Sequence, residues 1–157
     1  QEEYFSRIEK LMEPKYRMET ALALASFYFF AGKEKEAVHF LQKVFSDASV
    51  NQFSDLLFTT LFLHWLIHFD SRNFDLLKYL SSPLERIRQK QKNLFGTQRL
   101  MIDFMGKATR EKSSSQARIL RNDFLKKFSL LKKQNAEAHL FDYFDITLWL
   151  KKGNKIS

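Results

Sequence analysis

The chain has 157 residues, of which 28% are charged and 45% hydrophobic, and its formal net charge is +8. Its 17 Phe supply more apolar area than a disordered chain carries, while the scarcity of Gly (4) and Pro (2) argues against folds that need many tight turns. Because the sequence contains no Cys, disulfide frameworks, thiolate zinc sites and cysteine nucleophiles are excluded.

Hydrophobic periodicity predicts helices throughout the chain, and strand-like alternation does not occur. Pro14 either ends the first helix or opens the second, and Gly32 is placed to close the second. Asn51 and either Asp70 or Ser71 are expected to cap the two helices that begin beyond them. The predicted helices cover, in chain order, residues 1–13, 15–31, 33–46, 52–69, 73–80, 83–110, 116–133 and 136–151.

The clearest predicted helix start lies at Ser82. Pro83 would occupy the first helical position and Glu85 would complete a capping box. Within the helix that follows, Gly96 and Gly106 are places where a kink is expected. About eight helices joined by short loops predict one all-α domain over the whole chain.

The helix pair 15–46 has almost no loop between its helices. It places small, aromatic and apolar residues at Leu24, Tyr28, Gly32, Ala37 and Leu41. This hairpin resembles a tetratricopeptide repeat, and a degenerate second copy follows over 52–82, with Arg72 in place of the glycine and Leu77 in place of the alanine. The resemblance implies an α-solenoid of antiparallel helical hairpins, to which 83–157 would add further helices and a terminal cap.

Proteins of this repeat family generally bind other proteins and perform no chemistry, and the first helix of each hairpin lines a concave groove. The resemblance therefore implies a non-catalytic scaffold or regulatory domain that holds an apolar partner segment and needs no cofactor. The matching groove positions are Glu19, Leu22, Ser26, Phe29, Thr59, Phe62, Leu66 and Phe69. Since Phe27 to Phe30 are four consecutive aromatic residues that wrap a helical turn, several of them are expected to be plain core.

Positive charge is concentrated in one third of the chain. Residues 84–133 contain 14 basic and 4 acidic residues. Such a block either keeps long helices soluble or contacts an anionic partner. The alternative function is therefore a basic helical module that contacts nucleic acid, such as the regulatory part of a transcription factor. Its candidate contacts are Arg88, Lys92, Arg99, Arg118 and Arg121.

The sequence contains no complete catalytic motif, neither a glycine-rich phosphate loop nor a nucleophile elbow, so we expect no enzymatic activity. His64 and His68 could face one metal, but Trp65 stands where a zinc-protease helix has its glutamate, and no metal site is expected.

Between Asp55 and Asp70 lie only 14 residues, fewer than the roughly 20 apolar residues that a membrane-spanning helix needs. We therefore expect a cytoplasmic setting without membrane insertion. Because the chain opens without Met in a helix-like pattern, we also expect a piece of a longer protein.

Overall fold

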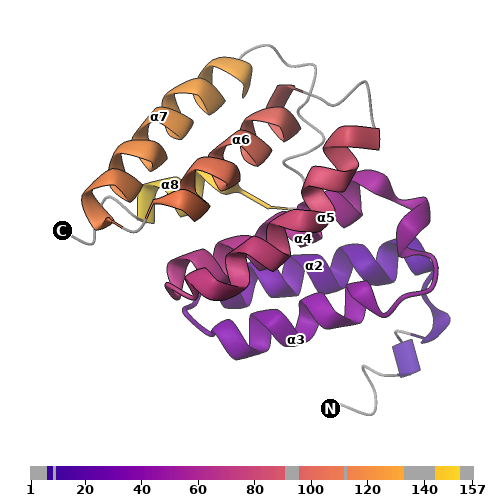
Figure 1. Cartoon of the computed structure of the whole chain (residues 1–157). Helices are drawn as coiled ribbons and strands as arrows, with labels where there is room; N and C mark the ends of the chain where they lie inside the picture. The colour runs from indigo at the N-terminus through magenta and orange to yellow at the C-terminus, as the bar shows by residue number, and fades with distance from the viewer. Residues whose placement is uncertain (1–6, 9, 91–95, 112, 133–143, 153–157) are drawn as a thin grey trace. The chain divides into compact units, whose positions relative to one another are not determined.

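The computed structural model describes residues 7–8, 10–90, 96–111, 113–132 and 144–152, and these residues form helices and turns with no strand (Figure 1). The all-α prediction is therefore confirmed for the described part of the chain. Its helices are α2 (Pro14–Phe30), α3 (Glu34–Phe45), the short 3-10 helix η1 (Val50–Gln52), α4 (Ser54–Asp70), α5 (Phe74–Lys90), α6 (Gly96–Arg110), α7 (Ser114–Lys132) and α8 (Ile146–Lys152). Described residues of the predicted first helix, 7–8 and 10–11, are also helical.

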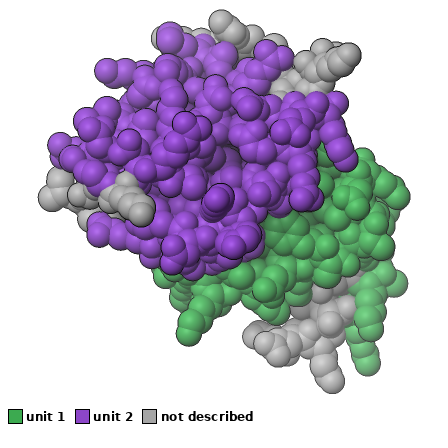
Figure 2. Space-filling model, in the orientation of Figure 1, with its two compact units in different colours: residues 1–60 green, residues 61–157 purple. Residues whose placement is uncertain are grey.

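The chain forms two compact units, unit 1 (Gln1–Thr60) and unit 2 (Leu61–Ser157), which Figure 2 shows in different colours. The boundary falls inside α4, so one continuous helix contributes its first part to unit 1 and its second part to unit 2. Whether the whole chain behaves as the single predicted domain stays a prediction.

Unit 1 contains the predicted hairpin of α2 and α3, which lie side by side (Figure 1). Pro14 opens α2, where its missing N–H costs no intrahelical hydrogen bond. At the other end the Lys33 N–H donates to the Tyr28 carbonyl at 2.9 Å, and the Gly32 N–H donates to the Phe29 carbonyl at 3.1 Å. This is a Schellman motif, and it needs the left-handed backbone that Gly32 adopts at φ 74°.

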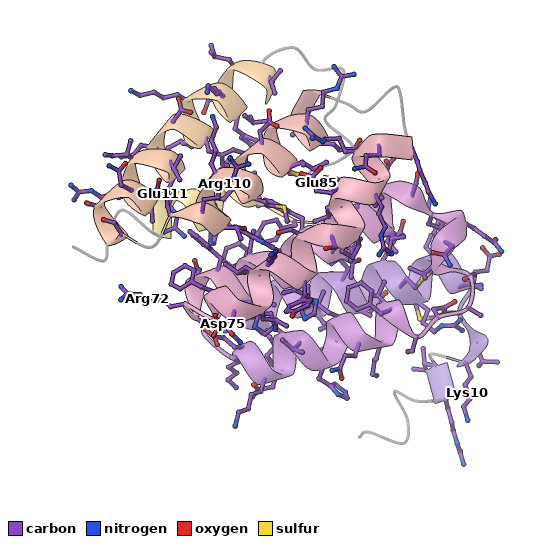
Figure 3. The ribbon with its side chains drawn as sticks, in the orientation of Figure 1. Lys10, Arg72, Asp75, Glu85, Arg110 and Glu111 are labelled. Atoms are coloured by element: carbon purple, nitrogen blue, oxygen red, sulfur yellow. The ribbon has the colours of Figure 1, made fainter. Side chains whose placement is uncertain are left out.

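The turn between α4 and α5 repeats this motif 40 residues later. The Asn73 N–H donates to the His68 carbonyl at 2.9 Å, and the Arg72 N–H donates to the Phe69 carbonyl at 3.1 Å. Arg72 takes the place of Gly32, so a side-chain-bearing residue is held at φ 57°. Its exposed side chain extends outward from the turn (Figure 3). The hydrogen bonds of the motif therefore outweigh a backbone strain of about 1 kcal/mol.

The same 40-residue offset relates buried positions on either side of the two turns. Ala37 and Leu77, which follow the turns, are both 0% exposed, and so are Leu22 and Phe62, which precede them. The turn after α4 thus repeats the local geometry of the turn after α2, and the assignment of 52–82 as a second repeat stays a prediction.

Helix α4 is apolar on most of its sides, which is typical of an interior helix. The buried apolar residues of α4 are Leu56, Phe58, Phe62, Leu63, Trp65, Leu66, Ile67 and Phe69. Its two threonines satisfy their hydroxyls inside the helix, since Thr59 donates to the Asp55 carbonyl at 2.9 Å and Thr60 to the Leu56 carbonyl at 2.7 Å. None of the described helices has both the length and the apolar content required to cross a membrane.

The predicted helix start at Ser82 is wrong. Helix α5 runs without interruption from Phe74 to Lys90, with Pro83 inside it. Leu77 and Leu84 lie seven residues apart on one face and are both 0% exposed. Burial of Leu77 and Leu84 stabilises the continuous helix by more than the missing Pro83 hydrogen bond costs. The helix therefore does not start anew at Ser82.

Three further predicted boundaries are also wrong. The predicted helix 83–110 falls in two elements, the end of α5 and α6 from Gly96, and residues 91–95 lie outside the described residues. Asn51 does not cap α4 but lies within η1, and α4 begins at Ser54. Neither Asp70 nor Ser71 caps α5, because Asp70 is the last residue of α4 and the Ser71 hydroxyl donates to the Ile67 carbonyl at 2.8 Å. The predicted last helix is described only from Ile146, and its earlier part lies outside the described residues.

Unit 2 has a core of aromatic rings drawn from several helices. The Phe104 ring of α6 stacks on Phe124 of α7 with centroids 4.7 Å apart, and it meets Trp65 of α4 edge-on at 5.9 Å. Phe69 stacks on Trp65 at 4.9 Å and contacts Trp149 of α8 at 6.3 Å. Rings in these orientations contribute beyond the area that they bury, so this cluster fixes how the helices of unit 2 pack.

Two glycine substitutions test the left-handed turn directly. Gly32→Ala should lower the free energy of unfolding by about 1 kcal/mol, because alanine is strained at positive φ. Gly106→Ala, inside α6, should raise it by up to about 1 kcal/mol, because alanine is the better helix former. An added Cβ meets no atom within 4 Å at either site, so backbone conformation alone separates the two variants. Urea denaturation measures both, and equal effects would contradict the assigned turn.

Candidate functional site

The groove positions predicted in unit 1 lie mostly in the interior. Leu22 is 0% exposed, Phe29 2% and Thr59 7%. Ser26 is 8% exposed and donates its hydroxyl to the Leu22 carbonyl at 2.9 Å. Glu19 alone is half-buried, and its carboxylate lies 3.7 Å from the Lys15 ammonium.

The three predicted groove positions in unit 2 are interior as well. Phe62 and Leu66 are 0% exposed and Phe69 is 8% exposed. Phe69 belongs to the aromatic core described above. These residues therefore have a sufficient role in packing, and contact between them and a partner stays a prediction that requires the interior to open.

Aromatic side chains do reach the surface of unit 1, at positions outside the predicted groove. The Phe27 side chain is 65% exposed and meets Tyr28 edge-on, with centroids 5.6 Å apart. Tyr28 in turn stacks on Phe40 of α3 at 5.4 Å, with the two rings inclined by only 7°. We call Phe27, Tyr28 and Phe40 the aromatic surface. It joins the two helices of the hairpin through its ring contacts.

Two lysines lie over the rings of the aromatic surface. The Lys33 ammonium is 5.9 Å from the centroid of Tyr28, and the Lys43 ammonium is 5.3 Å from the centroid of Phe40. His39 packs edge-on against Phe40 at 5.5 Å. The apolar rings are thus bordered by positive charge, held in place by cation–π attraction.

The phase of the α2 helix separates the exposed position Phe27 from the buried position Phe29. Successive residues of an α-helix point about 100° apart, so Phe27 and Phe29 face nearly opposite directions. Since Leu22, Ala25 and Phe29 form one buried stripe, Phe27 must leave it. The run of aromatic residues concealed that periodicity, because all of its members are apolar.

A depression of about 260 Å³ lies near the other end of the same hairpin, lined by Arg17, Met18, Ala21, Lys43, Ser46 and Asp47. The Arg17 Nε donates to the Asp47 carboxylate at 3.1 Å, and the Ser49 backbone N–H donates to it at 3.0 Å. Burial raises the pKa of the Asp47 carboxyl, but the hydrogen bonds from Ser49 and Arg17 outweigh burial and hold that pKa below its ordinary value. The two charged residues therefore neutralise each other and serve the hairpin structure.

The basic residues predicted from the sequence have different environments. Arg88 pairs with Glu85 at 2.9 Å and approaches Asp103 of α6 at 3.8 Å. Arg99 and Arg118 are exposed, and neither makes an ion pair with a described residue. Lys92 lies outside the described residues.

Arg121, which was predicted to contact an anionic partner, is instead paired inside unit 2. Its Nη2 donates to the Asp70 carboxylate at 2.9 Å, and the Trp149 indole donates to the other Asp70 oxygen at 3.0 Å. The Arg121 guanidinium also lies 4.1 Å from the Trp149 ring centroid. Burial lowers the pKa of Arg121, and the Asp70 carboxylate opposes that effect. Asp70 thereby connects the end of α4 to α7 and α8, and Arg121 is committed to this contact.

Removing either charge of this contact should destabilise unit 2. Arg121→Ala should lower the free energy of unfolding by about 2–3 kcal/mol, since it leaves the partly buried Asp70 carboxylate with one donor fewer. Arg118→Ala, one turn away and exposed, should change it by less than about 0.5 kcal/mol.

A double-mutant cycle with Asp70→Ala separates the pair from each residue's own packing. The two substitutions should be non-additive by about 1 kcal/mol or more in thermal or urea unfolding. Strict additivity would show that the two side chains do not interact.

His64 and His68 contact each other on α4, with ring centroids 5.0 Å apart. Burial, together with the charge of His68, lowers the pKa of His64 to about 4. Within the described chain, no group of three or more His, Cys, Asp or Glu side chains could hold a metal ion. The observed properties of the two histidines are therefore their ring contact and the lowered pKa of His64.

The depressed pKa of His64 predicts how stability depends on pH. The unfolded chain binds a proton at His64 near pH 6.5 and the folded chain only near pH 4, so the free energy of unfolding should fall as pH drops through this window. After allowance for solvent exposure, the loss should be about 1–3 kcal/mol. His64→Gln should flatten the pH dependence of urea unfolding between these limits. His39→Gln, on the exposed side of α3, serves as the control and should keep the wild-type slope.

Comparison with known proteins adds no relative. No family model matches the chain, and neither the curated proteins nor the solved structures contain a significant match.

Proposed function

We propose that the chain is a non-catalytic interaction domain that binds a partner protein segment on the aromatic surface of the α2–α3 hairpin. The observation that carries this proposal is the exposure of Phe27, a residue that is 65% exposed and belongs to a group of contacting aromatic rings. Exposed aromatic groups of this kind are typical anchors for protein partners.

The charges beside the aromatic surface define the chemistry of the partner. Lys33 and Lys43 border the rings. A complementary segment would carry one or two apolar anchor residues for the rings and acidic residues for the lysines. The partner so described is a short acidic segment with an aromatic or leucine anchor.

The repeated turn geometry supports a relation between this chain and helical repeat proteins, which generally bind other proteins. The Gly32 and Arg72 turns share one hydrogen-bond pattern at a 40-residue offset, as expected if the hairpins are units of one repeat. The proposed arrangement of these units is the tetratricopeptide-like solenoid inferred from the sequence. In helical repeat proteins, interior residues hold the hairpins together and outward residues are available for partners.

Peptide binding tests the proposal. The probe is a fluorescent peptide of about 15 residues with a central Trp-Leu pair flanked by glutamates, beside a second peptide in which the glutamates are lysines. Wild-type protein should bind the acidic peptide with a Kd of about 1–100 μM by fluorescence anisotropy, and the basic peptide at least about tenfold more weakly.

Matched variants locate the binding surface. Phe27→Ala should weaken the acidic peptide at least about fivefold, and Tyr16→Ala, an exposed aromatic residue about three turns away on α2, should not. Lys33→Glu should weaken it more than Lys35→Glu. Equal binding by wild type and Phe27→Ala, or no binding of the acidic peptide to wild type, would refute the proposal. Phe62→Ala should instead lower the free energy of unfolding by about 3–5 kcal/mol, which identifies a core residue.

A further inference from the structure

Helix α5 carries an exposed tyrosine on the face that points to solvent. Tyr79 is 75% exposed, the highest value among the large apolar side chains described in unit 2. Because α5 continues through Pro83, residues beyond the proline stay in register with Tyr79. At about 100° per residue, Ser82, Arg86 and Lys90 lie on the same side of the helix as Tyr79. All three are exposed, as the helix geometry requires.

We call Tyr79, Ser82, Arg86 and Lys90 the outer face of α5. The face is about 16 Å long, at 1.5 Å of rise per residue. It exists only because the helix predicted to begin at Ser82 is instead continuous, since a break there would have turned the second half away.

The cations of the outer face are not neutralised within the described chain. Arg86 and Lys90 make no ion pair with a described residue, and Lys78 at the edge of the face makes none either. Arg88 differs, because it points to the opposite side of α5 and is paired with Glu85. The outer face therefore keeps a net positive charge, with Asp75 as an exposed acid one turn before Tyr79.

Tyr79 has no apolar exposed neighbour on its own helix. One turn before it lie Asp75 and Leu76, and one turn after it lie Ser82 and Pro83; Asp75 and Ser82 are exposed, whereas Leu76 and Pro83 are half-buried. An apolar partner helix would find a single exposed ring there and no exposed hydrophobic stripe. A ligand with a planar group for the ring and regularly spaced negative charges for the cations fits this face. Single-stranded nucleic acid has this chemistry, because its unpaired bases are planar and its phosphates are negatively charged.

We propose that the outer face of α5 binds single-stranded nucleic acid, with a base stacked on the Tyr79 ring and phosphates on Arg86 and Lys90. Stacking requires an unpaired base, so a duplex is a poorer ligand. The length of the face accommodates several phosphates at about 3.4 Å per stacked nucleotide. This site is independent of the proposed partner site, since it lies in unit 2 and uses different residues.

Fluorescence anisotropy with a labelled oligouridylate of about 12 nucleotides tests the proposal on the whole chain. Wild-type affinity should fall clearly between about 50 mM and about 200 mM salt, because phosphate contacts release counterions. A duplex of the same length should bind at least about fivefold more weakly. No binding of the oligouridylate at the lower salt concentration would overturn the proposal.

Variants distinguish stacking from simple charge attraction. Tyr79→Ala should weaken the oligouridylate at least about fivefold, and Tyr79→Phe, which keeps the ring, should stay within about twofold of wild type. The double variant Arg86→Glu/Lys90→Glu should weaken it at least about tenfold and reduce the salt dependence. The control is Lys126→Glu/Lys127→Glu on α7, which makes the same change in net charge at two exposed residues, of which Lys127 is paired with Asp123, and should cost less than about threefold.

Other anionic partners are separate outcomes of the same assay. Heparin, polyglutamate and phosphatidylserine vesicles serve as competitors. Two results together would show that the face is a general polyanion surface and that the proposal is wrong. The first is that Tyr79→Ala binds the oligouridylate as tightly as wild type. The second is that a competitor displaces the oligouridylate equally well from both proteins. Equal losses in the α5 and α7 double variants would also overturn it. Circular dichroism melting of each variant confirms that it remains folded.

Discussion

The carboxylate of Asp70 holds together three helices of unit 2. It is the last residue of α4, where the partial negative charge of the helix end disfavours an acid. Arg121 and the Trp149 indole supply the donors that compensate, each to a different oxygen. Since these donors belong to α7 and α8, the end of α4 fixes both helices. The aromatic core beside them then packs in one arrangement, because Trp149 belongs to both clusters.

Packing of the interior determines which side chains are exposed and available for binding. Most of the residues that the repeat-family resemblance places in a binding groove are buried, so binding has to rely on exposed side chains. Two such places stand out, the aromatic surface of α2 and α3 and the outer face of α5. Both combine exposed rings with lysine or arginine, but they differ in organisation. The first gathers several rings across two helices, which suits an apolar anchor. The second isolates one ring in a row of cations, which suits a stacked base.

Sequence reasoning succeeded where a signal is local. Pro14 and Gly32 mark the ends of α2 because their backbone preferences act within one turn, and the periodic stripes predicted most helices. The helix start predicted at Ser82 is wrong, because burial of Leu77 and Leu84 stabilises a helix that continues through Pro83. Burial of that kind depends on tertiary contacts that a capping pattern does not contain.

The polar and surface features needed information from distant parts of the chain. Asp70 is 51 residues from Arg121 and 79 from Trp149, so its role as an acceptor had no sequence signature. Arg121 was accordingly assigned to anion contact when its charge is used internally. Phe27 could have been recognised as exposed from the phase of its helix, but the surrounding aromatic run gave every position the same apolar character.

Hydrogen exchange at the two tryptophan indole N–H groups tests most directly whether Asp70 organises unit 2. In the native protein, NMR should show both indoles protected, Trp149 by Asp70 and Trp65 by the Ser81 hydroxyl at 3.1 Å. Asp70→Asn should accelerate exchange at Trp149 and leave Trp65 protected. A Trp149 indole that exchanges in the wild-type protein as fast as in an unfolded peptide would contradict the account.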